Sequence, residues 1–509
     1  MNATPSTPRN TAGELATEHP ESLGRAKALA LGAAFLGGIF APGLRWALEG
    51  SEAQTEAVAK EMRKPAPEPE FGLAPARLSA LPAELSAWFD DRFGYRRELI
   101  RWAKAAVWFG AGDVADDAML RFDDDWLFFT GVGAMELHRG ELFEPEELAE
   151  WVEAFSAWHA WIEARDMQAI FCFAPDKQAV YAERMPDWIG PRAEVTRYDQ
   201  IRGGLAAEGI ELLHLHDDLI AAKDWGLLYY PLGTHWNARG CFVAYERIIN
   251  EMGTRLPGLV PHPLELFNEY DKTTMRDESG ARIFETWYGD SWIVRQHFPD
   301  WVRQECPELL PSFPLPFQIV DTWPSSSGLT DGRVVLPVPQ LPKLLLVRDS
   351  YGDELWPLLA HQCRELVSEG DRRFPWELIG RENPDVVLTL RVERFLMRPL
   401  PTFDLDPEGV RLARKWVAGG SRADWDPADR ITPILNPGPR VLRVERAEVA
   451  SEETMSVVAR GPWGSETLEV HFPADLRFQF VELPTDTRTV ELTAGSPVSL
   501  TLRAVDGDA

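Results

Sequence analysis

The sequence has few cysteines and no pattern that binds a nucleotide or a metal ion. Its 509 residues include four cysteines, which are scattered, with no Cys-x-x-Cys pair and no zinc spacing. There is no P-loop or dinucleotide fingerprint, and Gly131-Val-Gly133 reads as a turn. We therefore expect no cofactor and no bound metal, and the cysteines predict no disulfide.

Basic residues are scarce relative to acidic ones. Lys and Arg total 52 against 80 Asp and Glu, which gives a formal net charge of −28. Nucleic acids and anionic membrane surfaces are bound by basic patches, so this balance argues against both as partners. The same charge disfavours a strongly polyanionic substrate and favours a neutral or weakly charged one.

The N-terminal region combines a polar tail with one apolar run. Residues 1–23 are rich in Pro, Thr, Ser and Glu and are expected to be disordered. Residues 24–47 contain the charge-free run Ala28–Leu44 after Arg25 and Lys27, which predicts a transmembrane anchor or a signal peptide. The preceding positive charges favour export of the rest of the chain, and the lack of a small-x-small cleavage site favours an uncleaved anchor. Residues 48–79 then form a Pro-containing tether.

Alternation of helical and apolar strand-like segments predicts an α/β domain over residues 80–410, with a parallel sheet and helices on both faces. Strands are expected at Trp126–Phe129, Ala169–Ala174, Ile210–Leu213, Leu344–Val347 and Asp385–Leu390. Helices are expected at Pro145–Ala164, Tyr198–Glu208 and Ala238–Asn250. Residues 251–342 are Pro-rich and contain Trp287, Trp292, Trp301 and Trp323, which suggests an insertion that forms a lid or faces the substrate.

The last part of the chain has a different pattern. Across residues 440–509, short runs of alternating apolar and polar residues are separated by Gly, Pro and Asp turns. This pattern is typical of a small β-sandwich.

Two stretches carry the candidate chemistry. In Lys343–Ala360, a buried strand leads into a polar turn and a helix, and Ser350 lies on the turn. Backbone N–H groups that open such a helix point at the group that the hydroxyl attacks, as an oxyanion requires. In Tyr229–Asn237, His235 precedes a helix for which Asn237 is the expected N-cap. We interpret the two stretches as one site, although each also fits an ordinary helix cap or a structural histidine.

A second histidine pair, His214 and His216, would share one face of a strand. No third ligand follows at a usual spacing, so a structural role is favoured over a metal site. Asp217 and Asp218 are expected to cap a helix over Leu219–Lys223.

Several short motifs, in order along the chain, resemble those of the periplasmic alginate O-acetylation family. They are Glu61-Met-Arg63, Asp91-Arg-Phe-Gly-Tyr-Arg96, Trp126-Leu-Phe-Phe129, Ala174-Pro-Asp-Lys177 with Val180-Tyr181, Thr234-His-Trp-Asn237, Asp349-Ser350, and Pro384-Asp-Val-Val387 with Val392-Glu-Arg394. The resemblance implies an SGNH-hydrolase-like fold whose Asp-x-His-Trp and Gly-Asp-Ser motifs form the site. It places Ser350 and His235 as the catalytic pair, with supporting residues Asp349, Tyr351, Thr234 and Trp236.

The resemblance also implies a function and its partners. The expected activity is O-acetyl transfer to a polysaccharide in an exopolysaccharide modification or export system, and an esterase would use the same site. The acetyl donor would be a membrane-bound O-acyltransferase, and the protein would lie in the periplasm, anchored to the inner membrane by its N-terminal helix. The C-terminal strands would form either a carbohydrate-binding module or a structural cap.

Two positions depart from the family pattern. Gly233 stands where the aspartate of Asp-x-His is expected, and Arg348 replaces the glycine before Asp-Ser. The carboxylate of a Ser-His-Asp triad orients the imidazole, and its replacement by an amide costs about 10⁴ in rate. Another carboxylate could substitute, and the candidates are Asp217, Asp218, Asp353 and Glu393. Otherwise the site is a weak dyad, or the chain is a non-catalytic polysaccharide-binding or scaffold protein.

Overall fold

The structure is a computed structural model, and it divides into two compact units, residues 1–112 and 113–509. It describes residues 20–48, 66–72, 74–114, 117–122, 126–271, 307–312, 317–324, 330–370, 374–400, 407–419, 422–425, 431–433, 440–446, 453–472, 478–493 and 498–504. Four parts of the sequence discussed above lie outside the described residues: residues 1–19 of the predicted disordered tail (1–23), the motif at residues 61–63, three of the four tryptophans of the insertion, and Cys306. Residues 20–23 of that tail belong to a helix.

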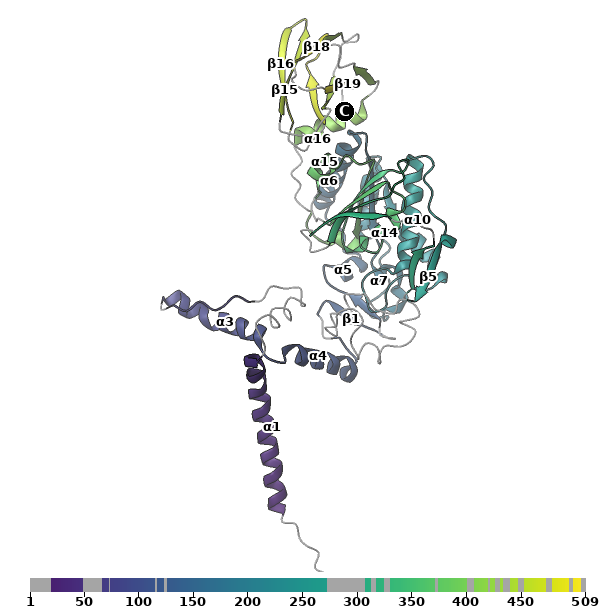
Figure 1. Cartoon of the computed structure of the whole chain (residues 1–509). Coiled ribbons are helices and arrows are strands. Elements are labelled where there is room, and N and C mark those ends of the chain that lie inside the picture. The colour runs from purple at the N-terminus through teal and green to yellow at the C-terminus, as the bar shows by residue number, and fades with distance from the viewer. Residues whose placement is uncertain are drawn as a thin grey trace, which may run out of the picture. The chain divides into compact units, whose positions relative to one another are not determined.

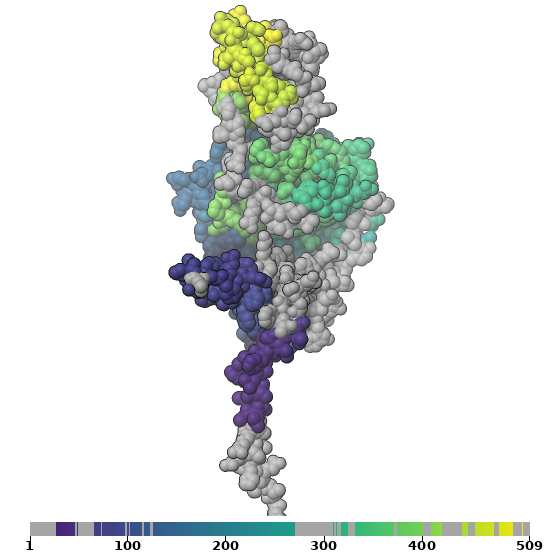
Figure 2. Space-filling model, turned by 60° about the vertical axis from the view of Figure 1, so that its left-hand side comes forward, coloured from purple at the N-terminus to yellow at the C-terminus, as the bar shows by residue number. Residues whose placement is uncertain are grey.

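The first unit consists of helices. They are α1 (Pro20–Leu48), α3 (Pro75–Arg92) and α4 (Arg96–Ala106), which continues into a π-helical turn at Val107–Ala111. The stretch Lys27–Arg45 within α1 has a mean hydropathy of 1.5 and is long enough to cross a membrane. Its side chains are almost all exposed (Figure 2). The predicted N-terminal apolar helix is therefore present, and its length and composition fit an anchor and a signal sequence alike.

The second unit is built on a seven-stranded sheet with the order β4-β3-β11-β9-β10-β8-β7. The strands that pair in parallel are β4 (Leu212–His214), β3 (Gln168–Ala174), β11 (Val386–Val392), β9 (Lys343–Arg348) and β10 (Glu365–Glu369). Because these strands run the same way, their carboxyl ends lie at one edge of the sheet, where the loops of such folds bind ligands.

Helices cover both faces of this sheet, as expected (Figure 1). Along β3, Ile170 and Cys172 enter one core cluster, whereas Phe171 and Phe173 enter the other. This alternation follows from the two-residue period of a strand. One face is covered by α9 (His216–Ala221), α10 (Ala238–Arg255) and α14 (Trp356–Ala360), and the other by α6 (Pro145–Glu163), α8 (Arg197–Ala207) and α15 (Trp376–Glu382).

The predicted parallel sheet is confirmed for five strands, and antiparallel strands extend it at one edge. Two strands from residues 251–342 add antiparallel to its edge, β7 (Gln318–Pro324) and β8 (Thr330–Val335). A further antiparallel pair joins β5 (Phe267–Asp271) to β6 (Pro307–Pro311). Short elements complete the domain: β1 (Met119–Arg121), β2 (Leu127–Phe129), α5 (Ala134–His138) and α7 (Lys177–Val180). Thus part of the Pro-rich segment extends the sheet.

The C-terminal strands form two four-stranded sheets that share one core. One sheet contains β12 (Arg422–Trp425), β19 (Val498–Ala504), β14 (Arg440–Arg446) and β17 (Phe478–Leu483). The other contains β13 (Ile431–Pro433), β18 (Thr489–Thr493), β15 (Glu453–Gly461) and β16 (Gly464–Phe472). Helix α16 (Pro407–Ala418) contributes Trp416 to a cluster with Ala164 after α6 and Phe480 of β17. The predicted strand-rich C-terminal region is confirmed.

Candidate active site

Ser350 lies directly beyond the carboxyl end of β9, on the turn predicted from the sequence. The turn is a short 3₁₀ helix, Ser350–Gly352, and α14 begins only at Trp356, so the single helix expected after the serine is divided in two. Asp349 caps the turn, because its Oδ1 accepts a hydrogen bond from the Tyr351 N–H at 2.9 Å. Its other oxygen accepts from the Val392 N–H at 2.7 Å, which ties the turn to the end of β11.

Arg348, the residue that departs from the family pattern, forms a buried network beneath this turn. Its side chain is fully buried and pairs with Asp331 at 3.4 Å and Asp353 at 2.6 Å. Its Nε donates to Ser368 Oγ at 2.6 Å. A Cβ atom on Gly352 would overlap the Arg348 side chain, so the turn accommodates the arginine by having glycine at that position. Arg348 therefore braces the serine turn with charged hydrogen bonds.

His235 is held at the end of a narrow loop between Tyr229 and Trp236, which pair as an isolated bridge. Asn237 ends the loop and caps α10, as predicted, by accepting from the N–H groups of Arg239 at 3.0 Å and Gly240 at 3.2 Å. The buried Lys177 ammonium donates to three loop carbonyls, those of Tyr230 at 3.0 Å, Pro231 at 2.9 Å and Gly233 at 2.5 Å. The loop therefore has little freedom to reorient the imidazole.

The two loops meet. His235 Nε2 lies 2.8 Å from Ser350 Oγ, within hydrogen-bond distance. Two further bonds join the loops, from Tyr351 Oη to the Thr234 carbonyl at 2.6 Å and from Trp236 Nε1 to the Tyr351 carbonyl at 3.0 Å. The structure thus brings together all six residues singled out in the sequence.

The second ring nitrogen of His235 faces a hydroxyl, not a carboxylate. Nδ1 lies 3.3 Å from Thr234 Oγ1, and among the described residues no carboxylate is within hydrogen-bond reach of the ring. Each proposed substitute is engaged elsewhere: Asp353 by Arg348, Glu393 by the Asp176 N–H and Arg192, Asp218 by Arg247, and Asp217 by His216. The hydroxyl can accept a hydrogen bond from Nδ1–H, and in that tautomer the Nε2 lone pair faces Ser350.

Two cations set the electrostatics of the imidazole. Burial, the Arg394 guanidinium and the Lys177 ammonium together lower the pKa of His235 from 6.5 to about 3. Arg394 is fixed by a short ion pair with Asp176, whose Oδ2 also accepts from the Arg394 N–H at 3.2 Å. Arg394 thus pairs with Asp176 rather than with its sequence neighbour Glu393. His235 is therefore neutral at physiological pH.

The sequence alone gives no role in the site to Lys177, which the structure brings to the imidazole together with Asp176 and Arg394. All three follow the carboxyl ends of β3 or β11, at the same edge of the sheet as Ser350. Their position directly after two parallel strands is the sequence signal for these residues, because the family-like motifs that contain them end β3 and β11.

The prediction that Asp217 and Asp218 cap a helix is wrong. Helix α9 begins at His216, three residues before the predicted start at Leu219, and Leu215 at its N-cap position makes no side-chain capping bond. Asp217 instead faces His214 and His216, and the three residues place their nitrogen and oxygen atoms within 4.8 Å of one another. Among the described residues, this is the group whose ligand atoms are arranged to hold a metal ion.

Comparison with protein families identifies the domain around this site. Residues 121–276 match the SGNH hydrolase-like domain of the acetyltransferase AlgX. The matched part of the AlgX-type domain contains the His235 loop and ends before Ser350. The resemblance stated from the sequence motifs is confirmed. A comparison with curated proteins found no match.

Three solved structures are similar to parts of the chain. PatB1 of Bacillus cereus is 13% identical over 56% of this chain and 100% of its own, with a TM-score of 0.41. The O-acetyltransferase domain of Pseudomonas putida AlgJ is 17% identical over 58% of this chain and 98% of its own, with a TM-score of 0.37. Pseudomonas aeruginosa AlgX is 13% identical over 76% of this chain and 93% of its own, with a TM-score of 0.35.

Proposed function

We propose that the protein is an O-acetyltransferase that carries an acetyl group on Ser350 and transfers it to a polysaccharide hydroxyl. The observation that supports this is the 2.8 Å approach of His235 Nε2 to Ser350 Oγ at the carboxyl edge of the sheet. Ser350 is half-buried, so an acyl donor can reach its hydroxyl. The AlgX-type domain makes acetyl transfer the expected reaction class.

The reaction follows from the geometry. His235 Nε2 takes the proton of Ser350 as Oγ attacks the acetyl carbonyl, and then returns it to the leaving alcohol. Among the described residues, no acceptor faces the Ser350 N–H, which leaves this donor available to the oxyanion. A sugar hydroxyl, deprotonated in turn by His235, then attacks the acetyl-serine and releases free Ser350. With water in place of the sugar, the same steps hydrolyse the ester.

The cations near His235 act in two opposite ways. Arg394 and Lys177 disfavour the imidazolium that forms when Ser350 loses its proton, as the low pKa of His235 indicates. The same positive field favours the negative charge that develops on the attacked carbonyl oxygen. With Thr234 in place of a carboxylate, the imidazole keeps its orientation but loses the charge that would stabilise its cation. We therefore propose a slow Ser-His dyad.

The cellular setting is part of the proposal. The apolar stretch of α1 would anchor the protein to the inner membrane, with the AlgX-type domain in the periplasm. A membrane-bound O-acyltransferase would supply the acetyl group, and an exopolysaccharide would receive it. The net charge of −28 favours a neutral or weakly charged polymer, and the C-terminal sandwich would serve as its binding module.

Turnover of a chromogenic acetyl ester tests the proposal. The full-length protein should release the chromophore, and a neutral oligosaccharide acceptor should gain acetyl groups. Ser350→Ala should reduce both rates by about 10³-fold or more. Val260→Ala, an exposed change in the loop after α10, is the control variant and should retain both activities.

A non-catalytic polysaccharide-binding or scaffold role is the second candidate. The observation that favours it is the lack of a carboxylate at His235 among the described residues. Wild-type protein that turns over the ester no faster than Ser350→Ala, yet retains oligosaccharide binding, would establish this alternative.

A further inference from the structure

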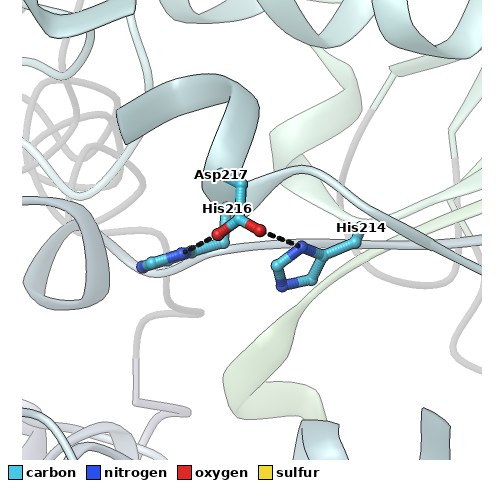
Figure 3. A group of neighbouring side chains, drawn as sticks. All are labelled: His214, His216 and Asp217. Atoms are coloured by element: carbon cyan, nitrogen blue, oxygen red, sulfur yellow. Dashed lines mark hydrogen bonds and ion pairs between the residues drawn. The ribbon is translucent and has the colours of Figure 1, made fainter. Parts of the chain in front are cut away.

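The cluster of His214, His216 and Asp217 lies at the carboxyl end of β4, an outer strand of the seven-stranded sheet. His214 is the last residue of β4, and His216 and Asp217 open α9. Figure 3 shows the Asp217 carboxylate between the two imidazoles, with one oxygen directed at each ring. The distances from these oxygens to Nδ1 are 3.1 Å for His216 and 3.7 Å for His214.

The hydrogen bonds of His216 place two acceptor atoms opposite each other. Its Nε2 lies 3.2 Å from the Ala179 carbonyl, which only accepts, so Nε2 carries the ring proton. In the neutral ring, Nδ1 is then also an acceptor, yet it faces a carboxylate oxygen, which accepts as well. Either a second proton on the ring or a cation must lie between the two atoms.

We propose that His214, His216 and Asp217 bind a divalent transition metal ion, for which Zn²⁺ is a suitable probe. Two imidazoles and one carboxylate are a ligand set that such ions accept, and exogenous water completes the coordination. The bond from His216 Nε2 to the Ala179 carbonyl is the outer contact that orients a ligating histidine. A cation there also separates His216 Nδ1 from the Asp217 oxygen that it faces, two atoms that both accept.

The geometry is close to that of a bound site. Ligand atoms about 2.0–2.1 Å from a tetrahedral zinc ion lie about 3.3 Å from one another. His216 Nδ1 lies 3.1 Å from one Asp217 oxygen and His214 Nδ1 lies 3.7 Å from the other, and one ligand atom from each residue lies within 4.8 Å of the other two. Asp217 is 85% exposed, and the imidazoles are about a quarter exposed, so small side-chain rotations can bring the ligands together and an ion can enter from solvent.

The bound ion has a structural consequence. His216 already contacts the Ala179 carbonyl of α7, so an ion on its Nδ1 links β4 and α9 to that short helix. Helix α7 also contacts this region through the core packing of Val180 and a bond from Lys223 Nζ to the Val180 carbonyl at 2.9 Å. We therefore expect metal binding to raise the thermal stability of the domain.

Titration calorimetry with ZnCl₂ on the full-length protein, prepared without a polyhistidine tag, tests the proposal. The wild type should bind one ion per chain, with a Kd of about 10 µM or lower, and the thermal midpoint should rise in ZnCl₂. Asp217→Ala and His214→Ala should each weaken binding by about 10-fold or more and abolish that rise. Asp217 is exposed, so its variant tests the site without disturbing the core.

Two matched variants make the result specific. Asp218→Ala removes the neighbouring acid of the same helical turn, and His159→Ala removes a histidine that lies 3.9 Å from a single carboxylate, Glu163. Both should bind Zn²⁺ as the wild type does. If the wild type binds no ion, or if Asp217→Ala and His214→Ala bind as tightly as these controls, the cluster is an ordinary hydrogen-bonded group and the proposal is overturned.

Discussion

Two groups of histidines lie at the same edge of the sheet, and they differ in what faces the imidazole. His235 lies between two cations, and its Nδ1 faces the Thr234 hydroxyl. His214 and His216, beyond the outer strand β4, face the Asp217 carboxylate. The comparison teaches that the surroundings of an imidazole set the role we propose for it. Burial and two nearby cations keep His235 neutral beside Ser350, whereas the Asp217 carboxylate between His214 and His216 is the basis of the proposed cation site.

The largest expected effect is loss of the base. His235→Ala should lower kcat/KM for an acetyl ester by about 10³-fold, because Ser350 then has no group to accept its proton. Stopped-flow or steady-state hydrolysis measures the rate. His159→Ala is the matched control and should retain wild-type activity. Equal losses in both variants would mean that any histidine substitution damages the fold.

The next largest expected effect is an increase in kcat. Gly233→Asp restores the carboxylate of the Asp-x-His pattern and should raise kcat by about 10-fold or more, because an anion stabilises the imidazolium. Gly233→Asn has nearly the same size without the charge and should show no such gain. The same hydrolysis assay applies to both. If the two variants have equal rates, the charge at position 233 does not limit the reaction.

The pH dependence separates the two kinds of histidine environment. Since the pKa of His235 is lowered to about 3, the base stays deprotonated and kcat/KM of the wild type should not fall between pH 8 and pH 5. Gly233→Asp should introduce a fall on the acid side of this range, because the carboxylate raises the pKa of His235.

One buried carboxyl could complicate this profile. Burial raises the pKa of Glu393 to about 7, so this group changes charge within the same range. A change of kcat/KM near pH 7 that disappears in Glu393→Gln is due to the titration of Glu393. A change near that pH that survives this substitution contradicts a neutral His235.

The smallest expected effect on the rate comes from removing the hydroxyl that contacts His235 Nδ1. Thr234→Val keeps the shape of the side chain but removes the acceptor at His235 Nδ1. We expect kcat to fall several-fold with KM unchanged, because the ring spends less time with its Nε2 lone pair toward Ser350. A change in KM alone would place Thr234 in substrate binding instead.

Much of this arrangement follows from local sequence signals. The buried strand before Ser350 and the Asn237 cap were predictable, because apolar runs and capping residues act over a few positions. The pairing of Ser350 with His235 followed from the rule that parallel strands end at one edge, together with the family resemblance.

Other features depend on contacts that no local pattern encodes. The Lys177 bonds to three carbonyls join segments more than 50 residues apart. Asp217 was expected to cap a helix that begins at Leu219, but α9 begins at His216, so Asp217 lies in its first turn with its carboxylate near two imidazoles. The antiparallel strands β7 and β8 arise from a Pro-rich segment, in which tertiary pairing outweighs weak local propensity.

Peptide mass spectrometry of the acyl-enzyme tests the central claim most directly. After brief incubation of the wild type with an activated acetyl ester and an acid quench, the peptide containing Ser350 should carry one acetyl group, which disappears when an acceptor is added before the quench. Ser350→Ala should give no such adduct. Ester turnover by the wild type with the acetyl group on another residue, or with no covalent adduct at any time point, would contradict the account.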